Sequence, residues 1–248
     1  MVESRWSVGA HSSEWVVNTF NQGYRDEISK TAYVSSNPQA WLVFMGNFEE
    51  HPLKGDTSNK YHNRLQRYKT TSIVNTNDFH TFNLLYDESN NYEPTLYPSP
   101  RSVTDHVIGL DRDDDPPQRI IAHYMPPHPP FIARMTNGEI EFTEVPRNSR
   151  SFEAYLDNLR WGLEEVSLLL KNVDRENVII TADHGWAFCL YPARNSHLPG
   201  MIAPDVRQVP WVETSATDDQ TYEPELSGEG ERESMPAEGT LEALGYLG

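Results

Sequence analysis

A long amphipathic segment that runs directly into a short apolar one constrains the fold of this chain most. Between residues 152 and 170, apolar residues recur at steps of three and four, the period of a helix with one buried face. They are Phe152, Leu156, Leu159, Leu163, Val166 and Leu170. Residues 178–182 (VIITA) then predict a buried strand, and residues 119–125 (RIIAHYM) predict another before the helix. Strand, helix and strand together predict an α/β fold with a mostly parallel sheet and helices on both faces.

The other segments predict one α/β domain, residues 1–216, followed by an acidic tail, residues 217–248. Within the domain, residues 45–100 are polar and aromatic-rich without a clear period, which suggests an insertion or a cap. The tail is rich in Asp, Glu, Gly, Ser and Pro, a composition typical of a solvated segment, and residues 240–248 predict a short terminal helix. Shorter elements are predicted within residues 12–20 (helix), 30–38 (strand), 79–87 (strand) and 102–113 (helix).

The balance of acidic and basic residues bears on nucleic-acid binding and on the salt concentration that suits this protein. The 248 residues carry 37 acidic and 20 basic side chains, a formal net charge of −17, and only five of the basic residues are lysines. Such a chain repels the phosphate backbone, so we expect no nucleic-acid partner. The balance also suits a halophilic protein, whose surface charge is screened by salt, although an ordinary acidic protein is the alternative.

The cysteine count and the lack of long apolar stretches limit which covalent links, metal sites and compartments we expect for this chain. Cys189 is the one cysteine, which excludes a disulfide within the chain and metal sites built from several cysteines. No apolar stretch approaches the roughly 18 residues of a membrane span, and the first residues lack the apolar core of a secretory signal. We therefore expect a cytoplasmic protein without a membrane span; its oligomeric state stays open.

Asp183 and His184 follow the strand 178–182 directly, where ligands of parallel sheets bind. A carboxylate and an imidazole together suit Zn²⁺, Mn²⁺ or another divalent ion, and Gly185 lets the backbone turn closely around it. His128 follows the preceding strand, and His197 lies in a loop rich in Pro and Gly. The alternative is that Asp183 caps the next segment and His184 is a packed core residue.

These motifs resemble those of a known family. NVIITADHG (177–185), NSHLPG (195–200) and VRQVPWV (206–212) resemble, in order, the C-terminal half of sulfatase-like hydrolases of the alkaline phosphatase superfamily. AHYMPPHPPF (122–131) is similar to another segment of that family, and LEALGYL (241–247) to its usual ending. SVGAHSSEWVVNTF (7–20) resembles a segment of its short members from salt-loving archaea.

The resemblance implies metal-dependent hydrolysis, or transfer, of sulfate or phosphate esters through a covalent intermediate. The cofactor would be a divalent metal ion (Zn, Mn, Ca or Mg), and the substrate a small anionic or glycan-type ester. The resemblance implies that Ser12 is the nucleophile, with Ser13 as the alternative, and that Ser13 and the adjacent His11 bind the substrate. His128 would hold substrate oxygens or donate a proton. Asp183 and His184 would be metal ligands, and His197 a second metal or substrate ligand. Arg194 and Arg207 would supply positive charge for the substrate. His123 is expected to point into the sheet and to be structural.

The chain also departs from that family. The family begins with an apolar strand that ends in an acidic metal ligand ahead of the nucleophile, and no such strand precedes Ser12 here. We therefore expect a sheet that is incomplete at the N-terminus, with neighbouring strand edges exposed. The alternative function is a catalytically inactive or truncated sulfatase-like module that serves binding or scaffolding. A phosphoglycerate-mutase-like or phosphodiesterase-like enzyme of the same superfamily, or an unrelated α/β protein, are further alternatives.

Overall fold

The computed structural model describes residues 1–44, 72–85, 99–139, 151–188 and 197–225. Its strands are β1 (Glu3–Trp6), β2 (Thr31–Ser35), β3 (Thr81–Leu84), β4 (Arg119–His123), β5 (Arg175–Thr181) and β6 (Gln208–Ala216). Its α-helices are α1 (Ser12–Thr19), α2 (Arg25–Ile28), α3 (Pro38–Phe44), α5 (Pro100–Asp111), α6 (Ala133–Thr136), α7 (Phe152–Leu169) and α8 (Pro204–Arg207). Short 3₁₀ turns lie at Gln22–Tyr24 and Thr76–Asp78.

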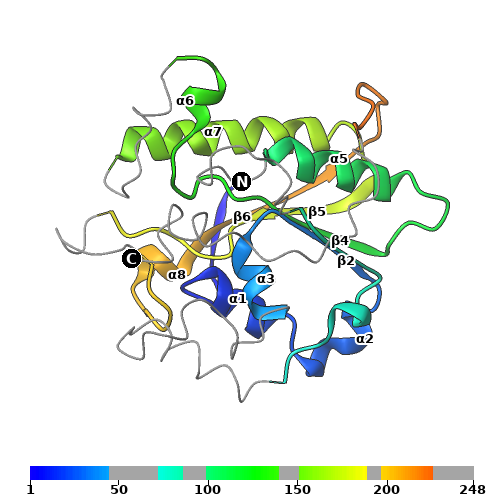
Figure 1. The fold of residues 1–248 in the computed structure, drawn as a ribbon, viewed down its shortest axis with the longest axis horizontal. Coiled ribbons are helices and arrows are strands. Elements are labelled where there is room, and N and C mark those ends of the chain that lie inside the picture. Colours follow the sequence, from blue (N-terminus) through cyan, green and yellow to red (C-terminus); the bar gives the residue numbers. More distant parts are fainter. Residues whose placement is uncertain (45–71, 86–98, 140–150, 189–196, 226–248) are drawn as a thin grey trace.

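The strands form two three-stranded sheets. One sheet has the order β3-β2-β4 and is parallel, whereas the other has the order β1-β6-β5 and is antiparallel. Helices α5 and α7 lie on one side of the strands, and α1 and α3 lie on the other (Figure 1). The expected α/β class is thus confirmed, but only one of the two sheets is parallel.

The core has one cluster on each side of β2. On the side of α1 and α3, aromatic rings pack around Tyr33, with Phe20 at a centroid distance of 4.8 Å and Phe79 at 6.1 Å. On the side of α5, Val34 packs with aliphatic residues of α5, and β4 and β5 both add partly buried side chains to this cluster. All five residues of β2 are buried because strands cover both of its edges and helices cover both of its faces.

Helix α7 buries a different face from the one that its apolar stripe predicts. Its buried residues are Ala154, Asn158, Gly162 and Glu165, whereas Phe152 is 54% exposed and Leu163 is 46% exposed. Asn158 accepts a hydrogen bond from the Ala133 amide at 2.9 Å, and Glu165 receives two from Arg101 at 2.7 and 2.9 Å. Small and hydrogen-bonded polar residues allow close packing here, so the prediction that Phe152 and Leu163 face the core is wrong.

The other elements agree with their sequence signals in part. The strand predicted within 79–87 is β3, and the helix predicted at 102–113 is α5, which begins two residues earlier because Ser99 caps it and Pro100 fixes its first turn. Most of the insertion expected at 45–100, and the helix expected at 240–248, lie outside the described residues.

The beginning of the expected tail is not free of the domain. Arg112 forms an ion pair with Asp218 at 2.8 Å and donates to the Tyr222 carbonyl at 3.0 Å. Asn172 Oδ1 accepts from the Tyr222 amide at 2.9 Å. This segment therefore packs against the ends of α5 and α7. In the part of the chain that the structure describes, no helix combines the length and the apolar character that crossing a membrane requires.

Candidate functional site

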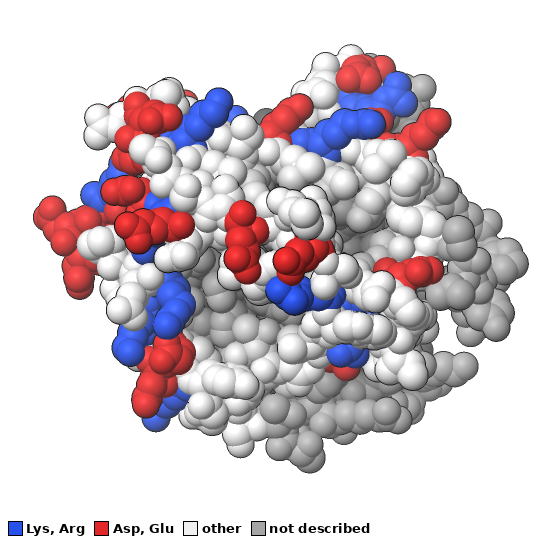
Figure 2. Space-filling view, turned by 180° about the vertical axis from the view of Figure 1, so that it is seen from behind, with Lys and Arg blue, Asp and Glu red and all other residues white. Residues whose placement is uncertain are grey.

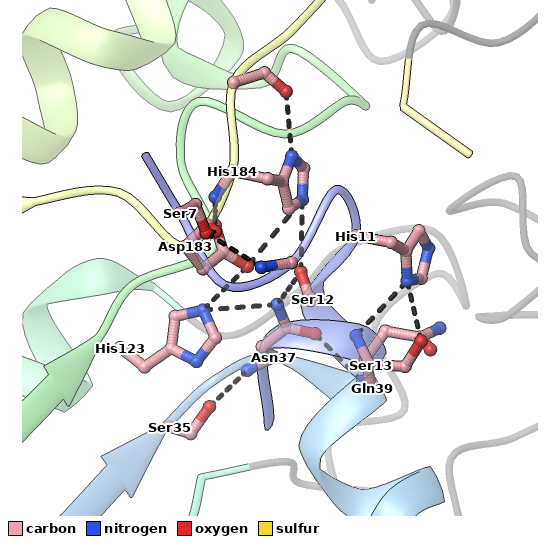
Figure 3. Close-up of polar contacts among 12 residues, drawn as sticks. Ser7, His11, Ser12, Ser13, Ser35, Asn37, Gln39, His123, Asp183 and His184 are labelled. Carbon is pink, nitrogen blue, oxygen red and sulfur yellow. Dashed lines mark hydrogen bonds and ion pairs between the residues drawn. The ribbon is translucent and has the colours of Figure 1, made fainter. Parts of the chain in front are cut away.

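Ser12 lies at the centre of the polar contacts drawn in Figure 3. It is the first residue of α1, and its side chain is buried, because only 3% of the residue is exposed. Ser12 Oγ lies 3.3 Å from His184 Nε2 and accepts a hydrogen bond from Asn37 Nδ2 at 3.0 Å. The dipole of α1 also favours negative charge in its first turn, where Ser12 lies. Ser12 therefore has a buried hydroxyl with an imidazole within reach.

The orientation of His184 decides what it offers to Ser12. Its Nδ1 lies 2.9 Å from the Gly185 carbonyl, which only accepts hydrogen bonds, so Nδ1 carries the proton. The lone pair of Nε2 then faces Ser12 Oγ, which is the arrangement of a nucleophile and its general base. The turn needs Gly185, because a Cβ atom there would lie 2.3 Å from the Asp205 carbonyl oxygen.

Asp183 contacts residues at the ends of both sheets, Ser7 after β1 and His123 in β4. Its Oδ1 accepts from the His184 amide at 2.9 Å, and its carbonyl accepts from the Ser7 hydroxyl. Its Oδ2 is buried without a hydrogen bond, 3.5 Å from His123 Nε2 and 3.7 Å from His184 Nε2. Burial acts to raise the pKa of Asp183, but the neighbouring imidazoles outweigh it and hold that pKa below its ordinary value. The carboxylate is thus kept ionised.

His123 and Asn37 both contact this group, whereas the sequence predicts a structural role for His123 and does not single out Asn37. Tyr33 Oη lies 2.7 Å from His123 Nδ1, and Asn37 Nδ2 lies 3.4 Å from His123 Nε2. Burial raises the pKa of Tyr33, which keeps its hydroxyl protonated. Their position in the sequence could have identified both as site residues. His123 ends β4 and Asn37 follows β2, at the carboxyl edge of a parallel sheet where ligands bind.

Four imidazoles converge beside this centre. The ring of His197 lies 4.5 Å from that of His184, 5.3 Å from that of His11 and 5.6 Å from that of His128. Trp186 covers the group, with its ring 4.4 Å from His197. Burial lowers the pKa values of His11 and His197 well below 6.5 and that of His128 to about 4, and the neighbouring His184 lowers them further. These three rings are therefore neutral at physiological pH.

The geometry of a metal site is present only in part. A metal ligand binds in the plane of the imidazole ring, but the rings of His184 and His197 are stacked at 19°, so their nitrogens do not converge on one ion. Among the described residues, no group of three or more His, Cys, Asp or Glu side chains is arranged to hold a metal ion. The buried, unbonded Oδ2 of Asp183 between two Nε2 atoms is the donor that such an ion would use.

The remaining predicted residues have other contacts. Ser13 Oγ lies 2.9 Å from His11 Nδ1, so these two pair with each other beside Ser12. Arg207 donates from Nε to the Ser7 carbonyl at 2.9 Å and thereby holds the turn after β1. Arg194 lies outside the described residues. Seen from behind, the described surface carries acidic and basic side chains interspersed (Figure 2).

No family model, curated protein or solved structure matches this chain.

Proposed function

We propose that this chain hydrolyses sulfate or phosphate esters, or transfers the group, through a covalent intermediate on Ser12. The observation that carries the proposal is the buried Ser12 hydroxyl between His184 Nε2 at 3.3 Å and Asn37 Nδ2 at 3.0 Å. A buried hydroxyl that meets a correctly oriented base and a second donor is suited to attack rather than to solvation.

The first step would form a bond from Ser12 Oγ to the phosphorus or sulfur atom while His184 Nε2 takes the serine proton. The bond to the ester oxygen breaks, and the alcohol leaves with a proton returned by His184. The amide of Asn37 and the first turn of α1 stabilise negative charge on Oγ. In the second step, water gives a proton to His184 and attacks the same atom. The bond from that atom to Ser12 Oγ breaks, and His184 returns the proton to Oγ, which releases the inorganic anion and restores Ser12.

A divalent metal ion is the cofactor that we propose, with Asp183 and His184 as its donors. When bound, such an ion would neutralise charge on the transferred group and lower the pKa of the serine hydroxyl. His184 Nε2 serves either as the base for Ser12 or as a metal donor, because it has one lone pair. Asp183 would in either case keep its negative charge next to His123 and His184.

Aryl phosphates and aryl sulfates, assayed in high salt, test the proposal. Ser12→Ala should lower kcat at least about 1,000-fold, as expected for the loss of a nucleophile. Ser13→Ala is the matched control, because Ser13 is equally buried but pairs with His11, and it should retain most of the activity. Equal activity in wild type and Ser12→Ala would refute the nucleophile, and no turnover of either ester class would favour a non-catalytic module.

Elemental analysis of the same preparations tests the cofactor. About one divalent ion per chain that is lost in Asp183→Ala would support metal-dependent chemistry. Turnover that depends on Ser12 but survives a chelator would contradict the metal and leave His184 as the general base.

A further inference from the structure

The carboxylate of Asp183 has one oxygen that is hydrogen-bonded and one that is not. Oδ1 accepts from the His184 amide at 2.9 Å, whereas Oδ2 is buried and has no hydrogen bond. Two imidazole nitrogens lie close to Oδ2, His123 Nε2 at 3.5 Å and His184 Nε2 at 3.7 Å. A buried carboxylate oxygen is costly without a donor, so the position of the proton on each of these two rings decides how firmly Asp183 is held.

Of these two rings in their neutral forms, only that of His123 can donate to Oδ2. The Nδ1 proton of His184 points to the Gly185 carbonyl at 2.9 Å, so its Nε2 carries a lone pair. In His123 the assignment is the reverse, because Tyr33 Oη lies 2.7 Å from His123 Nδ1 and Tyr33 is fully buried. Burial also raises the pKa of Tyr33, so its hydroxyl keeps its proton and needs an acceptor. Oη therefore donates to Nδ1, and the proton of His123 lies on Nε2.

The opposite tautomer of His123 fits the surrounding groups less well. Its Nε2 would accept from Asn37 Nδ2, whose orientation is set because Asn37 Oδ1 accepts from the Gln39 amide at 2.9 Å. That contact is long, at 3.4 Å, and Nδ2 already donates to Ser12 Oγ at 3.0 Å. The opposite tautomer would also turn a lone pair toward Asp183 Oδ2 and would leave the tyrosine hydroxyl without this acceptor.

Packing holds the ring of His123 in place. Its side chain is 10% exposed, and Trp15 packs edge-on against it at a centroid distance of 5.3 Å. Trp15 belongs to α1, the helix that begins at Ser12, and His123 ends β4. The helix that carries the serine thus also packs against the imidazole, and Figure 3 shows that ring beside Asp183 and Asn37.

We propose that Tyr33 and His123 are positioning residues, which act in series to hold the carboxylate of Asp183. Tyr33 fixes the tautomer of His123, and the Nε2 proton of His123 then fixes Oδ2. The consequence rests on the proposed function: when His184 takes the serine proton, the carboxylate stays in place and stabilises the positive charge on that imidazole. Both residues act through Asp183, so their loss should lower kcat and leave KM unchanged.

Heteronuclear NMR of the histidine side chains, on the full chain at neutral pH, tests the hydrogen bonds without any substrate. His123 should show an unprotonated Nδ1 and a protonated Nε2. In Tyr33→Phe, which removes the donor, the ring should become a mixture of both tautomers. Tyr124→Phe is the matched control, because Tyr124 Oη pairs with Thr104 Oγ1 at 3.0 Å, and it should leave the ring unchanged. In Asp183→Asn, the Hε2 proton of His123 should lose the downfield shift of a hydrogen bond to a carboxylate.

Kinetics on whichever ester class is turned over give the second test. His123→Leu removes both hydrogen bonds and should lower kcat roughly 10- to 100-fold at unchanged KM, the usual effect of losing a group that orients a carboxylate of the site. His123→Gln keeps a donor near the position of Nε2 and should recover most of that loss. Tyr33→Phe should lower kcat about tenfold, whereas Tyr124→Phe should stay within about twofold of the wild type.

Three outcomes would overturn the proposal. They are a protonated Nδ1 in wild-type His123, an unchanged His123 ring in Tyr33→Phe, and equal kcat in Tyr33→Phe and Tyr124→Phe. The last result would mean that Tyr33 only supports the fold. If His123→Leu fails to fold, the wild-type tautomer and the two tyrosine variants carry the test. Absence of turnover would contradict the proposed function, and the NMR signals would then decide alone whether this pair holds Asp183.

Discussion

Acid should destabilise this protein through its buried imidazoles. The pKa of His128 allows the loss in the free energy of unfolding to be calculated. Burial lowers the pKa of His128 from 6.5 to about 4 in the folded chain. In the unfolded chain the ring is expected to titrate near its reference value of about 6.5. Between these two values the unfolded state binds the extra proton, so stability falls as the pH is lowered through this window. Above about pH 6.5 the ring is neutral in both states and contributes nothing.

The magnitude follows from the same two values. A difference between 6.5 and about 4 corresponds to roughly 3 kcal/mol once only the unfolded ring is protonated, and to about 2 kcal/mol at pH 5. His11 and His197 act in the same direction, because burial lowers their pKa values too. Protonation of surface carboxylates works against this loss, since it reduces the repulsion of a chain with a net charge of −17.

A comparison of variants isolates the contribution of His128. Urea unfolding of the wild type, His128→Gln and His80→Gln would be measured at about pH 7.5, 6 and 5. Glutamine retains a donor for the Pro129 carbonyl, which His128 Nδ1 contacts at 2.5 Å. The free energy lost between pH 7.5 and 5 should be about 2 kcal/mol smaller in His128→Gln than in the wild type. The exposed His80 controls for the substitution itself, and its variant should follow the wild type.

Equal losses in wild type and His128→Gln would refute this reasoning. That result would mean that the imidazole is hydrated or protonated in the folded state, and that the imidazole cluster is more open than its burial indicates.

Two further predictions concern stability and are measured by the same unfolding assay. Gly185→Ala should lower the free energy of unfolding by at least about 2 kcal/mol, because its Cβ would lie 2.3 Å from a backbone oxygen. Gly162→Ala in α7, whose Cβ would lie 3.3 Å from its nearest atom, should stay within about 1 kcal/mol of wild type. Equal effects of the two substitutions would contradict the geometry of the turn at Gly185. Arg101→Met should cost about 2 kcal/mol, because it leaves the buried Glu165 without its partner, while Arg160→Met, which removes an exposed pair, should cost less than about 0.5 kcal/mol.

Local signals in the sequence located most elements. The segment 102–113 predicted most of α5, and the apolar run 178–182 predicted most of β5. These signals are reliable because they depend on neighbours in the chain. The buried face of α7 was missed, because an apolar stripe does not reveal that Asn158 and Glu165 have partners on other elements.

The candidate site likewise combines local structure that the sequence predicts with contacts that only the fold creates. The sequence by itself determined that Asp183 and His184 follow a strand and that a helix begins near Ser12, because both follow from local periodicity, although the residue that caps this helix is His11. Only the tertiary structure brought residue 12 within 3.3 Å of residue 184 and added Asn37 and His123 to the group. Such contacts depend on how two sheets meet, which is set by long-range packing and by strand order. The same packing placed Tyr33 of β2 beside His123 of β4, a contact that no local pattern of residues encodes.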